Sequence, residues 1–525
     1  MRILLDLSRK LAFVCVVFTA RMVLGCDQLP AGQSLWIRLA APVSTYTAKP
    51  GDHVHAVLTQ NLVCDNDIVL PMGSPIEGIV RSKRKVGWGI RHETASLELE
   101  FDHATARSGV DVALTARVEE VENARESVKK GVVQGIRSSN TFQGSINSRL
   151  IHLPTWNPYS DPFLIAYKAV FPIFPEPEIY YPAGTDIHLR TTKEIACPQV
   201  SDTTAQQSLL APKEESDAAA KTVSDLAAQA ESEKLDELVE QLPYRVTTSK
   251  RVNADMLNII LLGTQDEVTA AFREAGWHNA DPVSRHTVMK GLYALLNNSG
   301  YEQEPMMTFL LNGKPEDMNW QKSLNSYGRR DHLRIWQWPS TETANSVTNS
   351  VTDSIADPTA NSIWLSSSTH DTGAVLAVKY KGFVHHISPD IDDERSTVIR
   401  DLNFAGCVKS VTYVARPDMP TTTHNATGDV MHTDGSIAVV ALQNCQPANP
   451  ELDSNSKGGL NYRPGNYVFR FIRRQLLTFR NDIFRANIIY GTYDAGRRTV
   501  LAFRNPQPKS KPETTSEAKP VAGSN

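Results

Sequence analysis

Apolar and polar residues alternate through the first part of the chain in short runs that are separated by turn residues. Between Leu97 and Phe101, apolar residues alternate with glutamate, so an extended strand would carry its apolar side chains on one face. The same alternation predicts strands at Ser34–Leu39, His53–Leu62, Pro75–Val80, Ala95–Phe101 and Val110–Val121. Residues 27–198 are therefore predicted to form an all-β barrel or sandwich.

A Pro-x-Gly turn stands directly before a predicted strand at three places, beginning at Pro30, Pro71 and Pro182. Proline presets φ and glycine accepts positive φ, so each turn predicts a sharp entry into its strand. Together with the turn at residues 49–52, the first two turns resemble the periplasmic β-barrel domain of TrbI-type conjugation proteins. That resemblance implies a barrel fold.

An acidic segment, residues 199–247, separates this region from the rest of the chain. Its composition is dominated by Ala, Ser, Gln, Asp and Glu, which cannot bury an independent core. Within it, a narrow stripe of apolar residues runs from Val223 to Leu242 at helical spacing. We predict an acidic helical connector with a surface or partner-binding helix.

Beyond the connector, residues 248–503 alternate strand patterns with helix patterns. Met256–Gly263 reads as a buried strand, and residues 264–267 read as a capping box at the start of a helix that ends near Gly276. Further helices are predicted at 284–296 and 389–402, and further strands at 307–311, 331–336, 363–368 and 374–380. A four-residue repeat marks a loop insertion at 340–361, and residues 504–525 are predicted to be a disordered tail. The whole chain is thus an α+β multidomain protein, whose C-terminal part is α/β with a mixed sheet.

Four motifs of the C-terminal part occur in an order that resembles the LssY carboxy-terminal domain of bacterial envelope proteins. They are Phe309–Asp317, Gly328–Trp336, Ser368–Asp371 and His385–Arg395. The resemblance covers about residues 254–414 and implies a class of envelope protein, with no agreed enzyme activity.

Composition excludes some classes of function. The chain has 54 Lys and Arg against 58 Asp and Glu, a formal charge of −4, so no overall basic field attracts nucleic acid. Hydrophobic residues make up 41% of the 525 residues, which is ordinary for a globular protein.

The N-terminal residues 1–26 have the layout of a secretory signal peptide, with basic residues before a short apolar run. Arg21 interrupts the run too early for a membrane span. The segment Val23–Cys26 resembles a lipobox, so lipidation at Cys26 and plain cleavage near Gly25 are both open. Either outcome predicts a periplasmic protein or a membrane-anchored lipoprotein.

Four further cysteines fall two in each half of the chain. In an oxidising compartment, one disulfide between Cys64 and Cys197 and another between Cys407 and Cys445 would each cross-link one domain. The alternative is that these cysteines are buried free thiols.

Two sets of residues could carry chemistry. Arg330, His332 and Arg334 alternate along a predicted strand and could bind an anion, or the arginines could pair inside the fold with an acid such as Asp392.

The second set could bind a divalent metal or move protons. His370, Asp371 and His385 lie on neighbouring predicted strands, and Asp390 stands at the next helix start. The alternative for the acids is helix capping, because free amides and the helix dipole favour acids there.

Residues 467–485 form a basic amphipathic stretch. It could lie on an anionic membrane, or it could pack on its domain with its arginines in water.

These features favour a non-catalytic envelope protein that serves as a binding or assembly module, with envelope proteins or a membrane surface as partners and not nucleic acid. The alternative is a periplasmic metal-dependent hydrolase that uses the histidine and aspartate residues.

Overall fold

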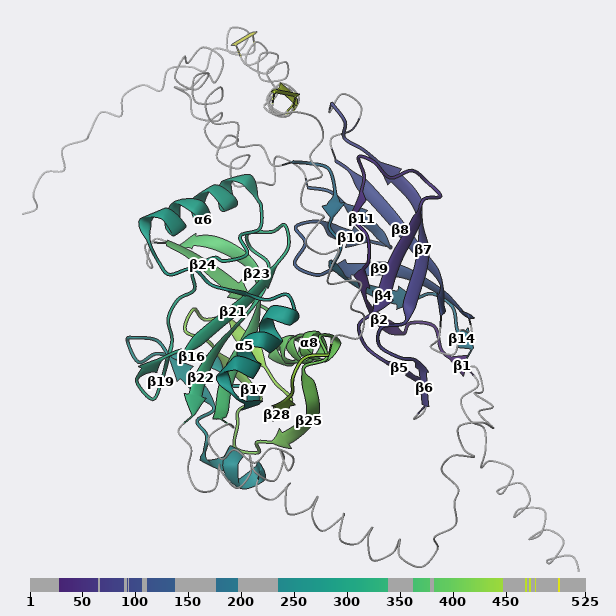
Figure 1. Ribbon diagram of the computed structural model, residues 1–525. Coiled ribbons are helices and arrows are strands. Elements are labelled where there is room, and N and C mark those ends of the chain that lie inside the picture. Colours follow the sequence, from purple (N-terminus) through teal and green to yellow (C-terminus); the bar gives the residue numbers. More distant parts are fainter. Residues whose placement is uncertain are drawn as a thin grey trace, which may run out of the picture.

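The computed structural model describes residues 28–64, 67–88, 92, 94–105, 111–136, 176–196, 235–338, 362–377, 382–446, 468–469, 472–473, 477 and 499–500. These residues form an N-terminal β-barrel and a C-terminal domain that is built on a mixed sheet (Figure 1). The predicted signal peptide with Cys26, the insertion at 340–361 and the tail at 504–525 lie outside the described residues.

Six antiparallel strands close the barrel. They are β2 (Ser34–Leu39), β4 (His53–Leu58), β7 (Pro75–Arg84), β8 (Ser96–Thr105), β9 (Asp111–Val121) and β13 (Asp186–Thr191). Their order is β8-β7-β4-β2-β13-β9, and β9 pairs back onto β8, so the ring is closed. The alternating residues Leu97, Leu99 and Phe101 are buried in its core, as the sequence pattern predicts.

Short strands complete the N-terminal domain. The pairs are β1 (Gln28–Leu29) with β14 (Ile195–Ala196), β3 (Val43–Ser44) with β12 (Tyr180–Tyr181), β5 (Leu62–Cys64) with β6 (Asp67–Leu70), and β10 (Ser127–Lys129) with β11 (Val132–Gln134). The three Pro-x-Gly turns are also present, because Gly32, Gly73 and Gly184 all have positive φ directly before or near the entry of β2, β7 and β13.

The main C-terminal sheet has the order β18-β21-β22-β23-β17-β28-β25, with β24 paired to β23. Its strands are β17 (Ile259–Gly263), β18 (His278–Asn279), β21 (Met318–Ser323), β22 (Arg330–Trp338), β23 (Ser362–Ala377), β24 (Gly382–Ile387), β25 (Val408–Ala415) and β28 (Ser436–Leu442). The sheet is mixed as predicted, since β17 runs parallel to β28 and the other neighbouring pairs are antiparallel.

Three labelled helices accompany this sheet: α5 (Gln265–Glu274), α6 (Arg285–Asn297) and α8 (Ile391–Phe404). The predicted capping box is present, because the Thr264 hydroxyl accepts from the Glu267 amide and the Glu267 side chain accepts from the Thr264 amide. The described part of the domain is nevertheless mostly β, with fewer helices than a regular α/β alternation would have.

Some strand predictions differ from the structure, and one of them, His53–Leu62, is divided between β4 and the first residue of β5. The predicted strands at 363–368 and 374–380 are joined in β23, because the polar residues between them continue the pairing with β22 and then with β24. The predicted strand Met256–Gly263 is split into β16 (Asn253–Met256) and β17. The Asn258 side chain at the break donates to the Ser368 and Ile391 carbonyls.

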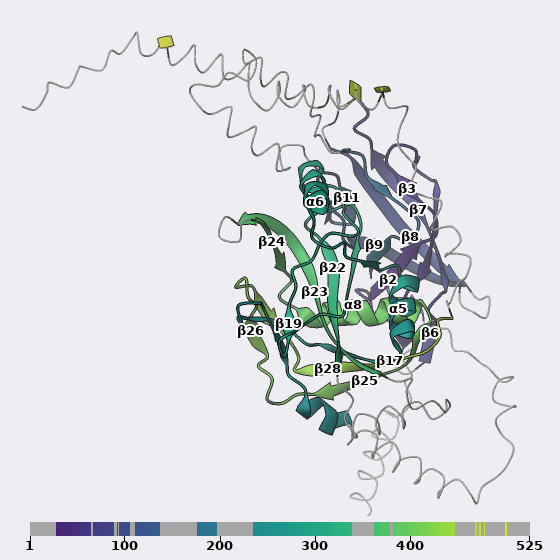
Figure 2. The same cartoon turned by 60° about the vertical axis from the view of Figure 1, so that its left-hand side comes forward.

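The two faces of the sheet are covered by different layers. On the face that we call the helix face, α5 and α8 pack against Leu333 and Ile335 of β22. The opposite face packs against residues 235–242 and a small sheet, and Trp336 of β22 is buried in the core between them. The small sheet consists of β15 (Arg245–Thr247), β16, β19 (Leu310–Leu311) and β20 (Lys314–Pro315), and a separate hairpin pairs β26 (Thr422–His424) with β27 (Val430–His432). Figure 2 shows α8 between the C-terminal sheet and the barrel.

The described end of the connector, residues 235–241, is helical. Leu235, Leu238, Val239 and Leu242 of the predicted apolar stripe are buried in the C-terminal core, so the partner of these residues is their own domain. The rest of the stripe lies outside the described residues.

The C-terminal amphipathic stretch returns to the barrel at its described residues. Leu477 joins the barrel core, and Phe469 packs edge-on against Trp88. The expectation of solvated arginines is wrong for Arg473. Its side chain is buried, with Nε donating to the Gly87 carbonyl at 2.7 Å and Nη2 donating to Glu178 Oε1 at 3.1 Å.

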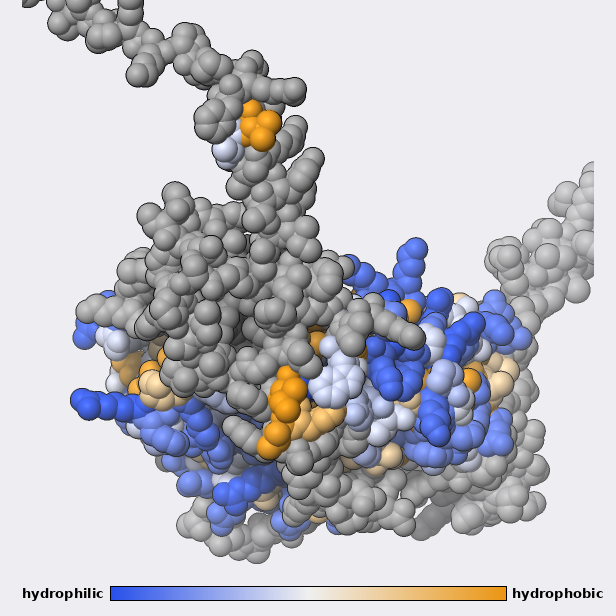
Figure 3. All heavy atoms as spheres, turned by 90° about the horizontal axis from the view of Figure 1, so that it is seen from above, coloured by the Kyte–Doolittle hydropathy of each residue, from blue (hydrophilic) through white to orange (hydrophobic). Residues whose placement is uncertain are grey.

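Seen from above, the described surface is mainly hydrophilic with small hydrophobic areas (Figure 3). Within the described part of the chain, no helix is both long enough and apolar enough to cross a membrane.

A disulfide joins Cys407 and Cys445 in the C-terminal domain. Cys64 of the barrel is also disulfide-bonded, and Cys197 lies outside the described residues. A cross-link between Cys407 and Cys445, which are 38 residues apart, restricts the unfolded chain.

Replacing both cysteines, Cys407→Ala with Cys445→Ala, should therefore lower the free energy of unfolding of the C-terminal domain by about 4 kcal/mol, by the loop-entropy relation. Urea unfolding of the oxidised proteins measures the difference. An unchanged midpoint in the double variant would contradict the prediction.

Candidate functional site

The predicted site residues are divided between two faces of the sheet. Strands β22 and β23 pair so that Arg330 stands opposite Asp371, and Asp331 stands opposite His370. Successive residues of a strand point to opposite faces. His370 and Asp371, which the sequence placed in one cluster, therefore belong to two separate clusters.

Asp371 is the centre of the cluster on the opposite face, which we call the Asp371 cluster. It comprises Arg330, His332, Asp371, His385 and Glu304. Arg330 Nε donates to Asp371 Oδ2 at 2.8 Å, and Arg330 Nη1 lies 3.2 Å from Glu304 Oε2. His332 Nδ1 and His385 Nδ1 lie 3.5 and 3.3 Å from the same Asp371 oxygen.

The surroundings fix the charges of this cluster. Burial alone would raise the pKa of Asp371, but His332, His385 and Arg330 together lower it to about 2. Burial lowers the pKa of His332 to about 3 and outweighs the attraction of Asp371. The cluster thus contains an ionised aspartate, a charged arginine and a neutral His332 near neutral pH.

The three anion-binding candidates are buried, and both arginines contact acids of the chain itself. Arg334 donates from Nε to the Met307 carbonyl at 3.0 Å and lies over the Phe309 ring, with Nη1 3.6 Å from Asp255 Oδ2. The expectation of pairing with Asp392 is wrong, because Asp392 contacts Arg395 one helical turn away. The alternative that these arginines pair with acids inside the fold thus describes the surroundings of Arg330 and Arg334. Binding of an external anion stays a prediction.

Asp390 does not join the other metal candidates. It stands at the exposed N-cap of α8, and its side chain makes no capping hydrogen bond. The helix-capping explanation is therefore also wrong for this residue. Asp392 in the first turn of the helix instead accepts from the Thr433 hydroxyl and the Asp434 amide.

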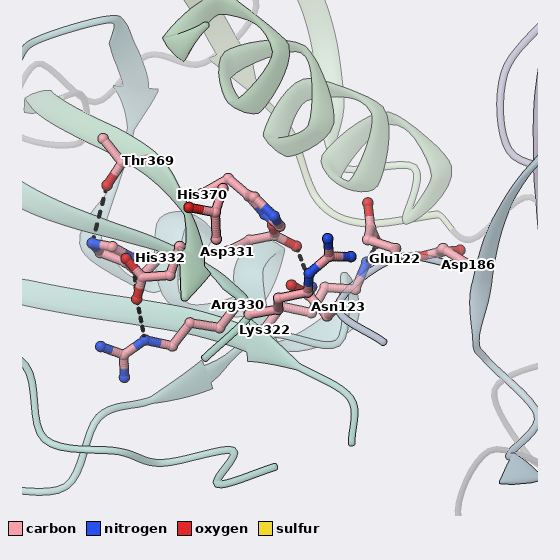
Figure 4. A network of polar contacts seen from close by, with 12 residues as sticks. Glu122, Asn123, Asp186, Lys322, Arg330, Asp331, His332, Thr369 and His370 are labelled. Carbon is pink, nitrogen blue, oxygen red and sulfur yellow. Dashed lines mark hydrogen bonds and ion pairs between the residues drawn. The ribbon is translucent and has the colours of Figure 1, made fainter. Parts of the chain in front are cut away.

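The helix face carries the second cluster, which we call the seam cluster: Asp331, His370, Glu394 and Asn123. Asp331 Oδ1 lies 2.6 Å from His370 Nδ1, and Asn123 Nδ2 of the barrel donates to Asp331 Oδ2 at 2.6 Å (Figure 4). Glu394 of α8 is buried beside them and shares a hydrogen bond with Asp331.

Burial, together with Asp331 and Glu122 nearby, raises the pKa of Glu394 well above its ordinary value. Burial lowers the pKa of His370, but the hydrogen bond to Asp331 raises it overall. Of the four residues that the sequence names as metal candidates, only His370 belongs to this cluster. Asp331 stands inside the motif Gly328–Trp336, whereas Asn123 is 208 residues away and has no local signal.

Beside the seam cluster, a buried ion network joins the two domains. It comprises Arg38, Glu122 and Asp186 of the barrel with Lys322, Arg400 and Asp401 of the C-terminal domain. Lys322 Nζ lies 2.6 Å from Asp186 Oδ2, 2.7 Å from Asp401 Oδ2 and 3.2 Å from Glu122 Oε2. Figure 4 shows Lys322 reaching toward Glu122 and Asp186.

The other two basic residues also reach across the domain boundary. Arg38 donates to Asp186 at 2.7 Å and to Asp401 at 3.2 Å. Arg400 donates to Glu122 at 2.6 Å and lies over the Trp36 ring at 3.8 Å from its centre. These contacts attach β2, β13 and Glu122, the residue after β9, to α8 and β21.

Burial disfavours the charged forms of Asp186, Lys322 and Glu122, and the neighbouring charges outweigh burial for Asp186 and Lys322. Arg38 and Lys322 hold the pKa of Asp186 well below its usual range, and the acids around Lys322 hold its pKa well above its usual range. For Glu122, burial exceeds the effect of Lys322 and Arg400 and raises the pKa to about 7.

Comparison with known proteins identifies part of the chain. Residues 239–437 match the family model described as LssY C-terminus. This confirms the likeness that the four motifs predict, and the matched region contains both clusters except Asn123. No curated protein matches the chain.

Among solved structures, the chain is similar to ComB10 of the Com type IV secretion system of Helicobacter pylori, at 12% sequence identity. The match covers 36% of this chain and 93% of that chain, with a TM-score of 0.20.

Lys322→Met should uncouple the two domains, because it leaves Asp186, Asp401 and Glu122 buried without their shared cation. We expect the free energy of unfolding to fall by about 3–5 kcal/mol, as when one partner of a buried pair is removed. Chemical denaturation measures this change.

Arg81→Met is the matched control, since Arg81 pairs with Glu98 and Glu100 on the exposed surface of the barrel. This control should leave stability almost unchanged, because exposed pairs contribute little. Equal effects of the two substitutions would contradict a special role for Lys322.

Proposed function

We propose that this chain is an exported cell-envelope protein in which the barrel and the LssY-like domain act together as one non-catalytic binding or assembly module. Export is supported by the signal-like layout of residues 1–26 and by the Cys407–Cys445 disulfide, because disulfides persist in oxidising compartments. The proposed partners are other envelope proteins or the membrane surface.

The observation that carries the module proposal is the ion network between the domains. Six charged side chains from both halves meet there, and Asp186 and Asp401 each contact a cation of the other half. Such contacts fix one relative orientation, since any other orientation leaves buried charges unpaired. A fixed arrangement of two domains is what a binding surface formed by both would require.

The titratable groups of the LssY-like region also favour a module over an enzyme. Asp331, Asp371 and His332 are all at most 5% exposed and contact groups of the chain itself. Catalytic acids and bases have to reach a substrate, normally in a cleft. Buried and mutually paired groups instead stabilise one arrangement of the fold.

The test uses the full chain in a bacterial host, with cross-linking and purification from envelope extracts. Wild type should recover a reproducible stoichiometric partner from the membrane or periplasmic fraction. Lys322→Met, checked for folding by its melting curve, should lose this partner because the two domains no longer hold one orientation, whereas Arg81→Met should retain it.

Cys26→Ser in the same experiment separates the two forms of export, because only a lipidated protein would move from the membrane to the soluble fraction. Recovery of the wild-type chain from the cytoplasm with its N-terminus intact would refute the envelope assignment. An unchanged partner in Lys322→Met would refute the two-domain module.

A periplasmic metal-dependent hydrolase is the second candidate, favoured by one observation. In the Asp371 cluster, three buried atoms, His332 Nδ1, Asp371 Oδ1 and His385 Nδ1, make no hydrogen bond. Unsatisfied buried polar atoms are costly and recur at functional sites. These atoms could therefore serve proton transfer or a ligand.

His385→Ala tests this candidate with phosphate-ester and carboxylic-ester substrates supplied with zinc or manganese. An enzyme that uses the cluster should lose at least about 100-fold in rate, the usual contribution of a general acid or base. His386→Ala is the control, because His386 contacts Asp429 away from the cluster. Equal rates in wild type and His385→Ala would exclude this cluster as the catalytic site.

A further inference from the structure

The seam cluster has the geometry of a metal site that differs from the ligand set suggested by the sequence. One ligand atom each from Asp331, His370 and Glu394 can be chosen so that all three lie within 4.8 Å of one another. These residues come from β22, β23 and α8, so three separate elements converge on one point. Two ligand atoms that each lie about 2.0–2.2 Å from one ion are at most about 4.4 Å from each other, so the observed spacing is close to what one shared ion requires.

Two further atoms of this cluster lack partners. Glu394 Oε1 and Asn123 Oδ1 are buried and accept no hydrogen bond, and both residues are at most 3% exposed. A buried acceptor without a donor is destabilising unless something else satisfies it. A cation in the cluster would satisfy Glu394 Oε1. Asn123 presents Nδ2 to Asp331, so its oxygen would face the ion with the amide turned over, and the orientation of an amide is exchangeable between its oxygen and nitrogen.

The charges around the cluster also favour a cation. The seam cluster and the ion network together contain five carboxyl groups, on Glu122, Asp186, Asp331, Glu394 and Asp401, against three permanent cations, on Arg38, Lys322 and Arg400. Lys322 cannot supply the missing charge to the cluster, because its ammonium group already contacts Asp186, Asp401 and Glu122. When all five carboxyl groups are ionised, the excess is two negative charges, which equals the charge of one divalent ion.

We propose that Asp331, His370 and Glu394, joined by the side-chain oxygen of Asn123, bind one divalent transition-metal ion at the seam between the two domains. One imidazole nitrogen with carboxylate and amide oxygens suits zinc or manganese. The His370 side chain is 23% exposed, which gives the ion a route from solvent. Because Asn123 belongs to the barrel, the ion connects the two domains and its role is structural.

This site excludes the other residues that the sequence grouped with His370. Asp371 and His385 contact each other on the opposite face of the sheet, and Asp390 is exposed at the start of α8. Replacing His370 should therefore abolish metal binding, whereas replacing His385 should not. This proposal does not depend on the module proposed above. The protein could bind a partner without holding a metal ion, or hold the ion without binding a partner, and the two experiments distinguish these results.

The experiment uses tag-free mature protein, stripped with a chelator and then dialysed against zinc chloride or manganese chloride. Elemental analysis and calorimetric titration measure the ion, and melting curves with and without chelator measure its effect on the fold. Wild type should bind about one ion per chain and melt at a lower temperature after stripping, because a ligand that binds only the folded state stabilises it.

His370→Ala and Glu394→Gln should each lose the stoichiometric ion, and their melting temperatures should no longer respond to the chelator. His385→Ala should bind like wild type, which makes it the matched control on the neighbouring strand. Asn123→Ala should weaken binding by about 10- to 100-fold, the range for supporting residues at metal sites.

A wild-type chain that holds no stoichiometric zinc or manganese would overturn the proposal and would mean that protons alone neutralise the cluster. Loss of the ion in His385→Ala together with retention in His370→Ala would overturn it as well, by moving the site to the other face. Glu394→Gln keeps the shape of the buried side chain. If this variant folds and still binds the ion, Glu394 is not a ligand and the proposed site is wrong.

Discussion

The contact of Lys322 with three acids is the interaction on which the arrangement of the two domains depends. Asp186 belongs to the barrel, Asp401 belongs to α8, and both lie within 2.7 Å of the same ammonium group. Taking these charges out of water is unfavourable, so they stabilise the docked state only when all partners meet in one geometry. The network therefore acts mainly by selecting one orientation of the domains.

The strict alternation of side chains along β22 extends this constraint into the sheet. Asp331 faces α8 and the barrel, whereas Arg330 and His332 face the Asp371 cluster. A shift of one residue in the register of β22 would exchange the two sets and bury the wrong charges on each face. The docking of the barrel and the register of the sheet are thus specified by the same pairing.

Much of the fold could be predicted from the sequence because its determinants are local. Alternation predicts β2 and β8, and a capping box predicts the start of α5. The merged strand β23 could not be predicted in this way, since the backbone of its polar middle residues pairs with β22, which is another part of the chain.

The candidate site was less predictable for the same reason. His370 and Asp371 are neighbours in sequence, and only the strand geometry separates them. Asn123 reaches Asp331 only because the barrel docks on α8 and β21, and no spacing in the sequence indicates a contact between halves of the chain. Residue type alone identifies groups that can carry chemistry, but their partners are set by tertiary structure.

The burial of the charged side chain of Arg473 is likewise set by tertiary structure. A basic amphipathic stretch normally keeps its arginines in water, but this side chain is buried against the barrel, where Glu178 and the Gly87 carbonyl accept its hydrogen bonds. The barrel therefore holds buried ionic contacts with two later parts of the chain: one is formed by α8 and β21, and the other is Arg473. Because each contact buries charges that only the correct partner neutralises, the barrel determines where both later segments bind, and its closed ring of six strands provides the rigid support that this requires.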